Sequence, residues 1–398
     1  MKCIVGLERL AADASLANKW GRCALVCNQA SVTSEMVPAW TVLSTILGSR
    51  LTALFGPQHG FYGTSQDNMI ETKHMKHVSF GVPLYSLYSE TREPTAEMLQ
   101  NVDTIVIDLQ TTGCRIYTWK ATIAACMRAS VKYRKKVVIL DRPNPVGGEI
   151  CEGRVLDSDS TSFVGEFPIP MRHALTAGEA AKFFNQSIAC DLQVVELQHW
   201  DPKSYWCDLE RTWVLTSPNL PTIDSVYVYP GTVIFEGTNL SEGRGTGLPF
   251  QFIGAPYLPE GDAYRNMVLK LLGGTSPGVF LRSAQFEPTS QKWMGKTCRG
   301  LQIHVTDCRA IRSLDLSIAL IRAAIELGNG GFGWKDPPYE YDYKTLPMKL
   351  IYGSQKSDQK FMGKDFSLED PFWHEGIRSY IDKAAKILIY PRSLSGPR

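Results

Sequence analysis

The sequence predicts an α/β fold in which a Rossmann-like domain, with a mostly parallel sheet, precedes a smaller α+β domain. Over roughly the first 150 residues, short runs rich in Val, Ile and Leu alternate with helix-compatible segments, which is the pattern of βαβ units. These runs are apolar almost without interruption, as is required of strands that helices cover on both faces. The sheet should therefore lie sandwiched between helices.

Each of the first four predicted strands ends in a polar cluster. We expect these strands at residues 23–27, 51–55, 104–107 and 137–140, and the clusters that follow them begin at Asn28, Gly56, Asp108 and Asp141. In open parallel sheets, ligands bind outside the carboxyl ends of the strands. The chemistry of this protein is therefore expected at that edge of the sheet.

The remaining elements follow from the same patterns. Pro94 suits the first turn of a helix at 95–99, and Thr176 with Glu179 has capping-box spacing for a helix that reaches residue 184. Other helices are expected at 39–47, 119–133, 314–327 and 377–387, and other strands at 192–197 and 300–305. From Thr212 the chain turns to loops punctuated by Pro and Gly. We therefore predict a Rossmann-like domain over residues 1–205 and an α+β domain over 206–398, with the active-site cleft between them.

Charge and composition exclude several classes of partner. The chain has 42 Lys and Arg against 40 Asp and Glu, a formal charge of +2, so no strong field is available to hold a nucleic acid or an acidic membrane. Glu8 interrupts the N-terminus before an apolar run reaches signal-peptide length, and no run approaches the roughly 20 apolar residues of a membrane span. Ten scattered cysteines fit buried free thiols. These features predict a cytoplasmic protein.

No cofactor or metal is expected from the motifs. The sequence lacks GxGxxG after its first strand and lacks GxxxxGK[ST], and the glycine-rich segment 242–247 follows no clear strand. It also lacks GxSxG and HExxH, so triad and zincin chemistry are not indicated. The nearest cysteine pair, Cys23 and Cys27, is spaced along a strand and not as a zinc site requires.

The polar residues near the strand ends and in the later loops suit a sugar. Carboxamides, carboxylates and arginines can hydrogen-bond hydroxyls and amides, aromatic faces can cover the ring, and two carboxyl groups can provide acid and base. The candidates are Asn28, Gln58, His59, Tyr62, Asp108, Arg115, Tyr117, Asp141, Arg142, Asn144, Asn219, Glu236, Asn239, Glu242 and Arg244. Purely structural roles stay open: Asp108 and Asp141 could cap helices, and Glu236 or Glu242 could hold the glycine-rich loop.

Eight motifs spread over most of the chain resemble those of the NamZ family of exo-β-N-acetylmuramidases. They are LFGPQHG at 54–60, VPLYSLY at 82–88, DLQTTGCRIY at 108–117, LDRPNP at 140–145, SFVG at 162–165, PMRH at 170–173, SPNLP at 217–221 and EGTNLSEGRGT at 236–246. The resemblance implies a metal-free glycosidase with a cleft between two domains. It would release terminal N-acetylmuramic acid (MurNAc) from its β-1,4 link to N-acetylglucosamine (GlcNAc) in peptidoglycan fragments, during cell-wall turnover or recycling.

Two departures from the family pattern each remove a carboxyl group from the expected cleft. Gln58 stands where the family's Pro-Glu-His-Gly motif has its glutamate, and Thr111 stands at the second acidic position of the motif that begins at Asp108. A carboxamide cannot act as a general acid. We therefore take as candidate acids the carboxyl groups of Asp67, Glu71, Glu236 and Glu242. The 2-acetamido carbonyl of the substrate could also attack C1 itself, which reduces the number of carboxyl groups required.

The lactyl carboxylate that distinguishes MurNAc from GlcNAc needs a forked cation, and Arg115, Arg142 and Arg244 are the candidates. Two other functions stay open. The chain could be a non-hydrolytic muropeptide or amino-sugar binding protein that lost its acid at Gln58, or a doubly wound enzyme for another small polar metabolite.

Overall fold

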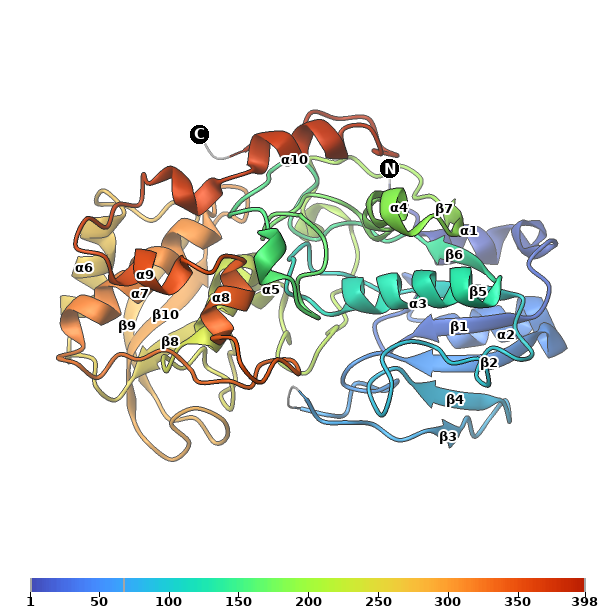
Figure 1. Ribbon diagram of the computed structural model, residues 1–398, viewed down its shortest axis with the longest axis horizontal. Coiled ribbons are helices and arrows are strands. Elements are labelled where there is room, and N and C mark those ends of the chain that lie inside the picture. Colours follow the sequence, from blue (N-terminus) through green and yellow to red (C-terminus); the bar gives the residue numbers. More distant parts are fainter. Residues whose placement is uncertain (1, 67–68, 397–398) are drawn as a thin grey trace.

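A computed structural model describes residues 2–66 and 69–396 as two lobes joined side by side (Figure 1). The first lobe is built on a seven-stranded sheet, and the second on a three-stranded sheet with its own helices. The α/β fold class, with a Rossmann-like domain and a smaller α+β domain, is confirmed. None of the helices in the described part of the chain is both long and apolar enough to cross a membrane.

The large sheet has the strand order β3-β4-β2-β1-β5-β6-β7. The strands are β1 (Cys23–Cys27), β2 (Leu51–Gly56), β3 (Met75–Lys76), β4 (Pro83–Ser86), β5 (Thr104–Asp108), β6 (Lys136–Leu140) and β7 (Asp191–Val195). All neighbours pair in parallel except β3, which runs antiparallel to β4 at the edge. Every residue of β1 and β5 is buried, which is why these strands are apolar throughout. The order reverses between β1 and β5, and a ligand site is expected outside such a switch point.

Helices cover both faces of this sheet. The helices α1 (Gly6–Ala12) and α2 (Ala39–Leu47) contact one another, and α3 (Trp119–Tyr133) contacts α4 (Ala177–Ile188). Thr176 accepts a hydrogen bond from the N–H of Glu179 and the Glu179 side chain accepts one from the N–H of Thr176, so the predicted capping box begins α4. The predicted helix at 95–99 is wrong. The segment forms turns: one bond from the Leu99 N–H to the Thr95 carbonyl is followed by tighter bonds from Gln100 to Glu97 and from Val102 to Leu99, so a first helical turn forms but is not propagated.

The second lobe has an antiparallel sheet in the order β8-β10-β9, with β8 (Phe252–Ala255), β9 (Val279–Phe286) and β10 (Cys298–Val305). Its helices are α5 (Ile223–Thr232), α6 (Ala263–Leu271), α7 (Ser313–Leu327), α8 (Pro347–Tyr352) and α9 (Ser357–Met362). Helix α5 packs on α7 at Gly231, where a Cβ atom would lie 1.8 Å from the Ser313 carbonyl oxygen. The predicted helix at 314–327 and strand at 300–305 are confirmed by α7 and β10.

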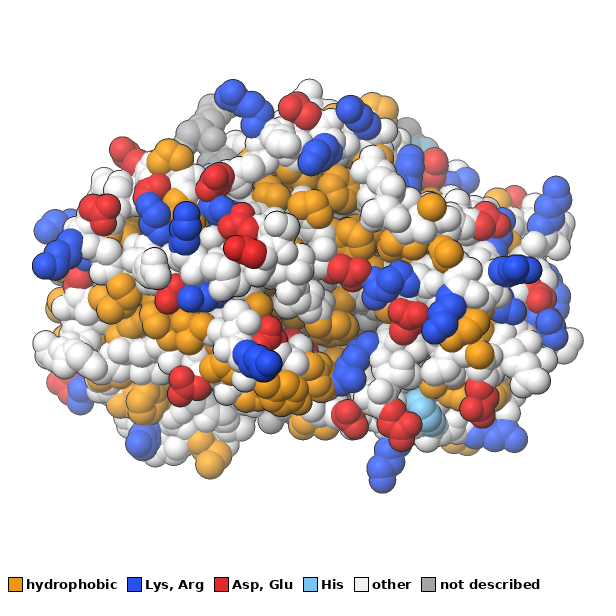
Figure 2. Space-filling model, viewed as in Figure 1, with side chains coloured by type: hydrophobic (Ala, Val, Ile, Leu, Met, Phe, Trp, Pro, Cys, Tyr) orange, Lys and Arg blue, Asp and Glu red, His pale blue; other side chains and the backbone are white. Residues whose placement is uncertain are grey.

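The C-terminal segment returns to the first lobe after α10 (Ile377–Ala384) (Figure 1). The Tyr390 hydroxyl donates to Asp141 Oδ2 at 2.7 Å, and Arg392 Nη2 donates to Glu179 Oε2 at 2.6 Å. The predicted domain boundary at residues 205 and 206 falls between β7 and β8 and stays a prediction. On the face shown in Figure 2, basic and acidic side chains are interspersed, consistent with the nearly balanced charge.

Candidate active site

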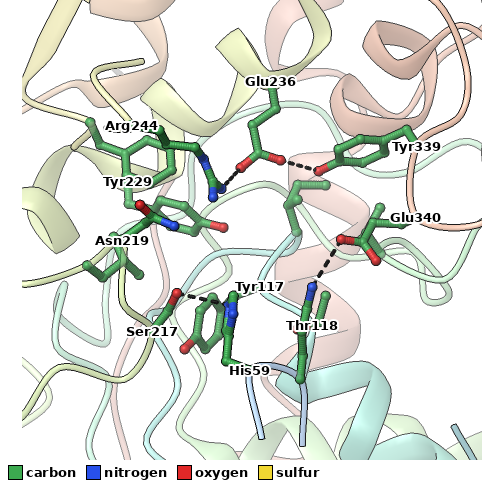
Figure 3. A pocket seen from close by; sticks show the side chains of 15 residues that line it. His59, Tyr117, Thr118, Ser217, Asn219, Tyr229, Glu236, Arg244, Tyr339 and Glu340 are labelled. Atoms are coloured by element: carbon green, nitrogen blue, oxygen red, sulfur yellow. Dashed lines mark hydrogen bonds and ion pairs between the residues drawn. The ribbon is translucent and has the colours of Figure 1, made fainter. Parts of the chain in front are cut away.

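A cavity with about 380 Å³ of empty space, part of it open to solvent, is lined by residues from both lobes. Six of the residues predicted to form the site line it: Gln58, His59, Tyr117, Asn219, Glu236 and Arg244. In Figure 3, Glu236 and Arg244 reach into the cavity from one side, and His59, Tyr117 and Thr118 face them from the other. Gln58 and Thr118 follow the carboxyl ends of β2 and β5, which is the edge that the sequence predicted.

Glu236 lies on a short 3₁₀ helix, η5 (Val233–Gly237), that continues directly from α5. Pro230 interrupts the hydrogen bonding of α5 near its end, and the backbone then tightens into η5. Arg244 Nη2 donates to Glu236 Oε1 at 2.5 Å, and the Tyr339 hydroxyl donates to Oε2 at 2.7 Å. The buried carboxylate of Glu236 is thus held by a cation on one oxygen and by a hydroxyl on the other, and the bond from the cation, Arg244, is charge-assisted.

Arg244 is itself fixed by a second carboxylate. Its Nε lies 3.1 Å from Glu242 Oε1, and Lys292 Nζ donates to Glu242 Oε2 at 2.8 Å. Burial alone would raise the pKa of Glu242, but the nearby charges of Lys292 and Arg244 outweigh it and lower that pKa. Glu242 does not line the cavity. An ionised carboxylate in this position orients the guanidinium and cannot supply a proton at neutral pH.

A second buried carboxyl group, Glu340, faces the Gln58 side of the cavity. Gln58 Nε2 donates to Glu340 Oε1 at 3.2 Å, and the Tyr88 hydroxyl donates to Glu340 Oε2 at 2.7 Å. The Thr118 hydroxyl donates to Gln58 Oε1 at 2.5 Å, which fixes the orientation of the carboxamide. Burial raises the pKa of Glu340, and the charge of Glu236 adds to that rise. The environments of Glu236 and Glu340 therefore differ in charge, as is typical of acid and base pairs in enzymes.

The backbone is left-handed at both sides of this contact. His59 has φ +68° and Glu340 has φ +43°, which is uncommon for residues other than glycine and costs free energy. His59 Nδ1 lies 2.7 Å from the Ser65 carbonyl oxygen, so Nδ1 carries the hydrogen and Nε2 accepts from the Ser217 hydroxyl at 3.0 Å. Strained turns of this kind cluster at functional sites.

Two of the three predicted arginines lie away from the cavity. Arg115 donates through Nη1 and Nη2 to the carbonyls of Arg154, Ile169, Ile351 and Tyr352, and burial lowers its pKa to about 10. Arg142 forms a two-pronged pair with Asp108, with Nε to Oδ1 at 2.5 Å and Nη2 to Oδ2 at 2.8 Å. Both residues of that pair are buried. These arginines hold the fold, and among the described residues Arg244 is the cation that lines the cavity.

The predicted asparagines other than Asn219 bind backbone. Asn28 donates to the Thr216 carbonyl at 3.2 Å and so positions the segment that carries Ser217. Asn144 donates to the Leu175 carbonyl at 3.1 Å, and Asn239 donates to the Gly331 carbonyl at 2.7 Å. None of these three side chains lines the cavity.

The other predicted residues lie elsewhere. Tyr62 is 47% exposed and packs edge-on against Trp40 and Phe61. The side chain of Glu71 is 55% exposed and lies 3.9 Å from Arg92, outside the cavity lining. Asp67 lies outside the described residues. Asp141 accepts from the Gly178 N–H and the Thr176 hydroxyl at the start of α4, which is the helix-capping alternative left open by the sequence.

Sequence reasoning missed five polar residues that line the cavity: Thr118, Ser217, Tyr229, Tyr339 and Glu340. Glu340 and its two neighbouring tyrosines directly follow Pro337 and Pro338, and an acidic residue between aromatic residues in a proline-rich loop is a signal that could have found it. In the part of the chain that the structure describes, no three His, Cys, Asp or Glu side chains group as metal ligands.

The chain is similar to several known proteins. A peptidoglycan β-N-acetylmuramidase, NamZ of Bacillus subtilis (strain 168), is 40% identical over 328 residues, which is 82% of this chain and 78% of that protein. Two crystal structures of DUF1343 family proteins from Bacteroides fragilis NCTC 9343 are similar. One has 26% identity and a TM-score of 0.87 over 98% of this chain and 99% of that one, and the other has 25% identity and a TM-score of 0.75 over 99% and 100%. The N-terminal and C-terminal profiles of exo-β-N-acetylmuramidase NamZ match residues 23–224 and 227–390. The chain therefore belongs to the NamZ family of exo-β-N-acetylmuramidases.

Proposed function

We propose that this protein is a glycosidase that releases terminal β-1,4-linked MurNAc from peptidoglycan fragments. The observation that carries the proposal is the cavity between the lobes, where the buried carboxyl groups of Glu236 and Glu340 face the same space as the guanidinium of Arg244. Two carboxyl groups in different environments can serve as the acid and the base of glycoside hydrolysis. The forked guanidinium of Arg244 suits the one anionic group of MurNAc, its lactyl carboxylate. Membership of the family and the named activity of the Bacillus subtilis relative support the same substrate class.

Exo action is supported by the shape of the site. The cavity adjoins a wider groove, with about 1470 Å³ of empty space, through Asn219 and Arg244, which line both. The terminal sugar would lie at the open side of the small cavity, and the groove, which includes Thr289 and Ser290 from the second lobe, would hold the remainder of the fragment.

Among the predicted acids that the structure describes, Glu236 lines the cavity whereas Glu71 and Glu242 do not, and we assign Glu236 a role as a carboxylate. Held by Arg244 and Tyr339, it can orient the substrate's acetamide or the attacking water. Arg244 Nη1 makes no hydrogen bond to any described residue while Nε and Nη2 contact Glu242 and Glu236. That leaves a donor for the lactyl carboxylate.

The test is release of chromophore from an aryl β-MurNAc glycoside, measured beside the aryl β-GlcNAc analogue. We expect turnover of the first and slow or no turnover of the second, and Glu236→Gln should reduce the rate by about 10²–10⁴-fold. The matched control is Glu97→Gln, which alters an exposed carboxyl group outside the cavity and should keep the wild-type rate. Equal turnover of both glycosides, or of neither, contradicts the proposal.

A binding protein without activity is the second candidate, and Gln58 is the observation that favours it. At the position of the family's acid, this carboxamide is hydrogen-bonded on both of its polar atoms and cannot protonate a leaving group. Calorimetry with MurNAc-GlcNAc separates the two functions. Binding without any product after prolonged incubation would select the binding protein.

We place this activity in the cytoplasm, in the recycling of cell-wall fragments. All ten cysteines are free, and the Sγ atoms of Cys207 and Cys308 lie 3.6 Å apart, so this pair could join in an oxidising compartment. Alkylation of thiols in intact cells followed by mass spectrometry is the test. Recovery of Cys207 and Cys308 as a disulfide would contradict a cytoplasmic location.

A further inference from the structure

The Glu340 carboxyl group is built into the cavity by contacts from the opposite lobe. Tyr88 and Gln58, which follow β4 and β2 of the first lobe, donate to its two oxygens, and Arg92 stacks 3.5 Å from the ring centroid of the adjacent Tyr341. Its backbone is held at a positive φ, and the residue is 4% exposed. Burying a carboxyl group costs desolvation free energy, and an ion pair usually offsets that cost. Neither donor to Glu340 is a cation, so stabilisation of the fold does not explain why the carboxyl group is buried here.

We propose that Glu340 is the general acid that protonates the leaving oxygen, and that Gln58 is a positioning residue that holds it by a hydrogen bond. This inference rests on the proposed function. In relatives with a glutamate at position 58, the same contact would join two carboxyl groups. In this chain the carboxamide of Gln58 donates to Glu340, as a protonated carboxyl would, and leaves Glu340 as the proton carrier of the pair.

The other carboxyl groups of the described site are less suited to this step. Glu242 is ionised beside Lys292 and Arg244 and does not reach the cavity. Glu236 accepts a charge-assisted bond from Arg244. Glu340 has a pKa raised by burial and by the charge of Glu236, so it retains its proton at higher pH than an ordinary glutamate.

The step balances as a hydrolysis. The proton of Glu340 passes to the glycosidic oxygen as its bond to C1 breaks, and the bonding electron pair stays on that oxygen, which leaves as a hydroxyl group of GlcNAc. The oxygen of a water molecule forms the new bond to C1, either directly or after the acetamido oxygen has held that position. The proton lost by this water returns, through solvent, to the Glu340 carboxylate, which restores the acid.

A comparison of leaving groups tests this assignment. Glu340→Gln should lower kcat/KM for MurNAc-GlcNAc by about 10²–10⁴-fold but reduce hydrolysis of dinitrophenyl β-MurNAc by less than about tenfold, because dinitrophenolate leaves without a proton. Glu97→Gln, which alters an exposed carboxyl group of the first lobe, is the matched control and should leave both rates unchanged. An equal loss on both substrates would show a structural role for Glu340 and overturn the proposal. Wild-type turnover of the dinitrophenyl glycoside tests the proposed function separately, so the two failures are distinguishable.

Two further measurements apply if Glu340→Gln does not fold. Among the described residues, the titratable and charged groups that face Glu340 include Tyr88, Glu236, Arg244 and Tyr339, with Arg92 beyond the rings of Tyr88 and Tyr341. Since the acid must be protonated, wild-type kcat/KM for the disaccharide should fall as pH rises through the raised pKa of Glu340, while the dinitrophenyl glycoside shows no such decline. A shared decline with the same midpoint overturns the proposal.

The variant Gln58→Glu tests whether the wild-type chain already has its acid in Glu340. A second carboxyl at this position should move the alkaline decline for the disaccharide to higher pH, because its charge disfavours ionisation of Glu340. The rate at the optimum should stay within about tenfold of wild type. A rise of about 10²–10⁴-fold would mean that the wild-type chain lacks an acid and that Glu340 does not serve as one.

Discussion

Replacement of Arg244 with Met should remove the preference of this protein for MurNAc over GlcNAc. Arg244 is the cation that lines the cavity among the described residues, and its Nη1 has no described partner there. Met keeps much of the length and apolar surface of the side chain but has no charge and no donor. The lactyl carboxylate would then be bound no better than the hydroxyl of GlcNAc.

The size of the effect follows from the bond that is lost. A hydrogen bond to a charged group contributes about 1.5–3 kcal/mol, and each 1.4 kcal/mol is a factor of ten, so the preference should fall by about 10- to 150-fold. Arg244→Met also leaves Glu236 and Glu242 without the cation that they share, which should lower the free energy of unfolding by about 3–5 kcal/mol. The ratio of the two kcat/KM values is therefore the quantity to measure, because the folded fraction cancels from it.

Lys292→Met is the matched control. Lys292 Nζ also pairs with Glu242, at 2.8 Å, but Lys292 does not line the cavity. Lys292→Met therefore removes a cation from Glu242 without removing a group that could contact the sugar. We expect lower stability and an unchanged substrate ratio. If Arg244→Met does not fold, Arg244→Lys keeps the charge but not the fork and should still lower the ratio. A wild-type ratio in a folded Arg244 variant would refute the assignment.

Three other outcomes are expected. Arg115→Met should lower the free energy of unfolding, measured with urea, by more than about 4 kcal/mol, because several buried carbonyls lose their donors. The soluble fraction should keep the wild-type preference for MurNAc. Loss of that preference would show that Arg115 contacts the substrate. Burial raises the pKa of Asp141 to about 7, so the folded chain binds this proton more tightly than the unfolded chain, and its contribution to stability should be lost as pH rises from about 4 to 7. Asp141→Asn should show a smaller loss of urea midpoint over that window, and parallel slopes would contradict the raised pKa. Dialysis against a chelator should leave the hydrolysis rate unchanged, whereas a loss that zinc or magnesium restores would contradict metal-independent chemistry.

The helices and strands could be predicted because their signals are local. The apolar runs of β1 and β5 and the capping box of Thr176 with Glu179 each depend on residues close together in the chain. The segment 95–99 also carried a local helix signal, but its helical hydrogen bonding does not continue beyond one turn. Placement of the site at the carboxyl ends of the strands also followed from the sequence, because parallel strands bring those ends to one edge.

Which arginine faces the cavity could not be predicted. Arg115, Arg142 and Arg244 each lie within one of the eight motifs, and the sequence offered no reason to separate them. The structure separates them by what surrounds each guanidinium: backbone carbonyls for Arg115, the Asp108 carboxylate for Arg142, and two carboxylates beside an open cavity for Arg244.

The sequence by itself determined the fold class and the family, because the signals for both lie in short runs of consecutive residues, and it placed a carboxamide, Gln58, in the motif LFGPQHG. Only the tertiary structure decided which carboxyl group stands beside Gln58. Glu340 is 282 residues away along the chain and reaches Gln58 through the packing of one lobe against the other. Its raised pKa likewise arises from burial and from the charge of Glu236, neither of which exists until the chain is folded.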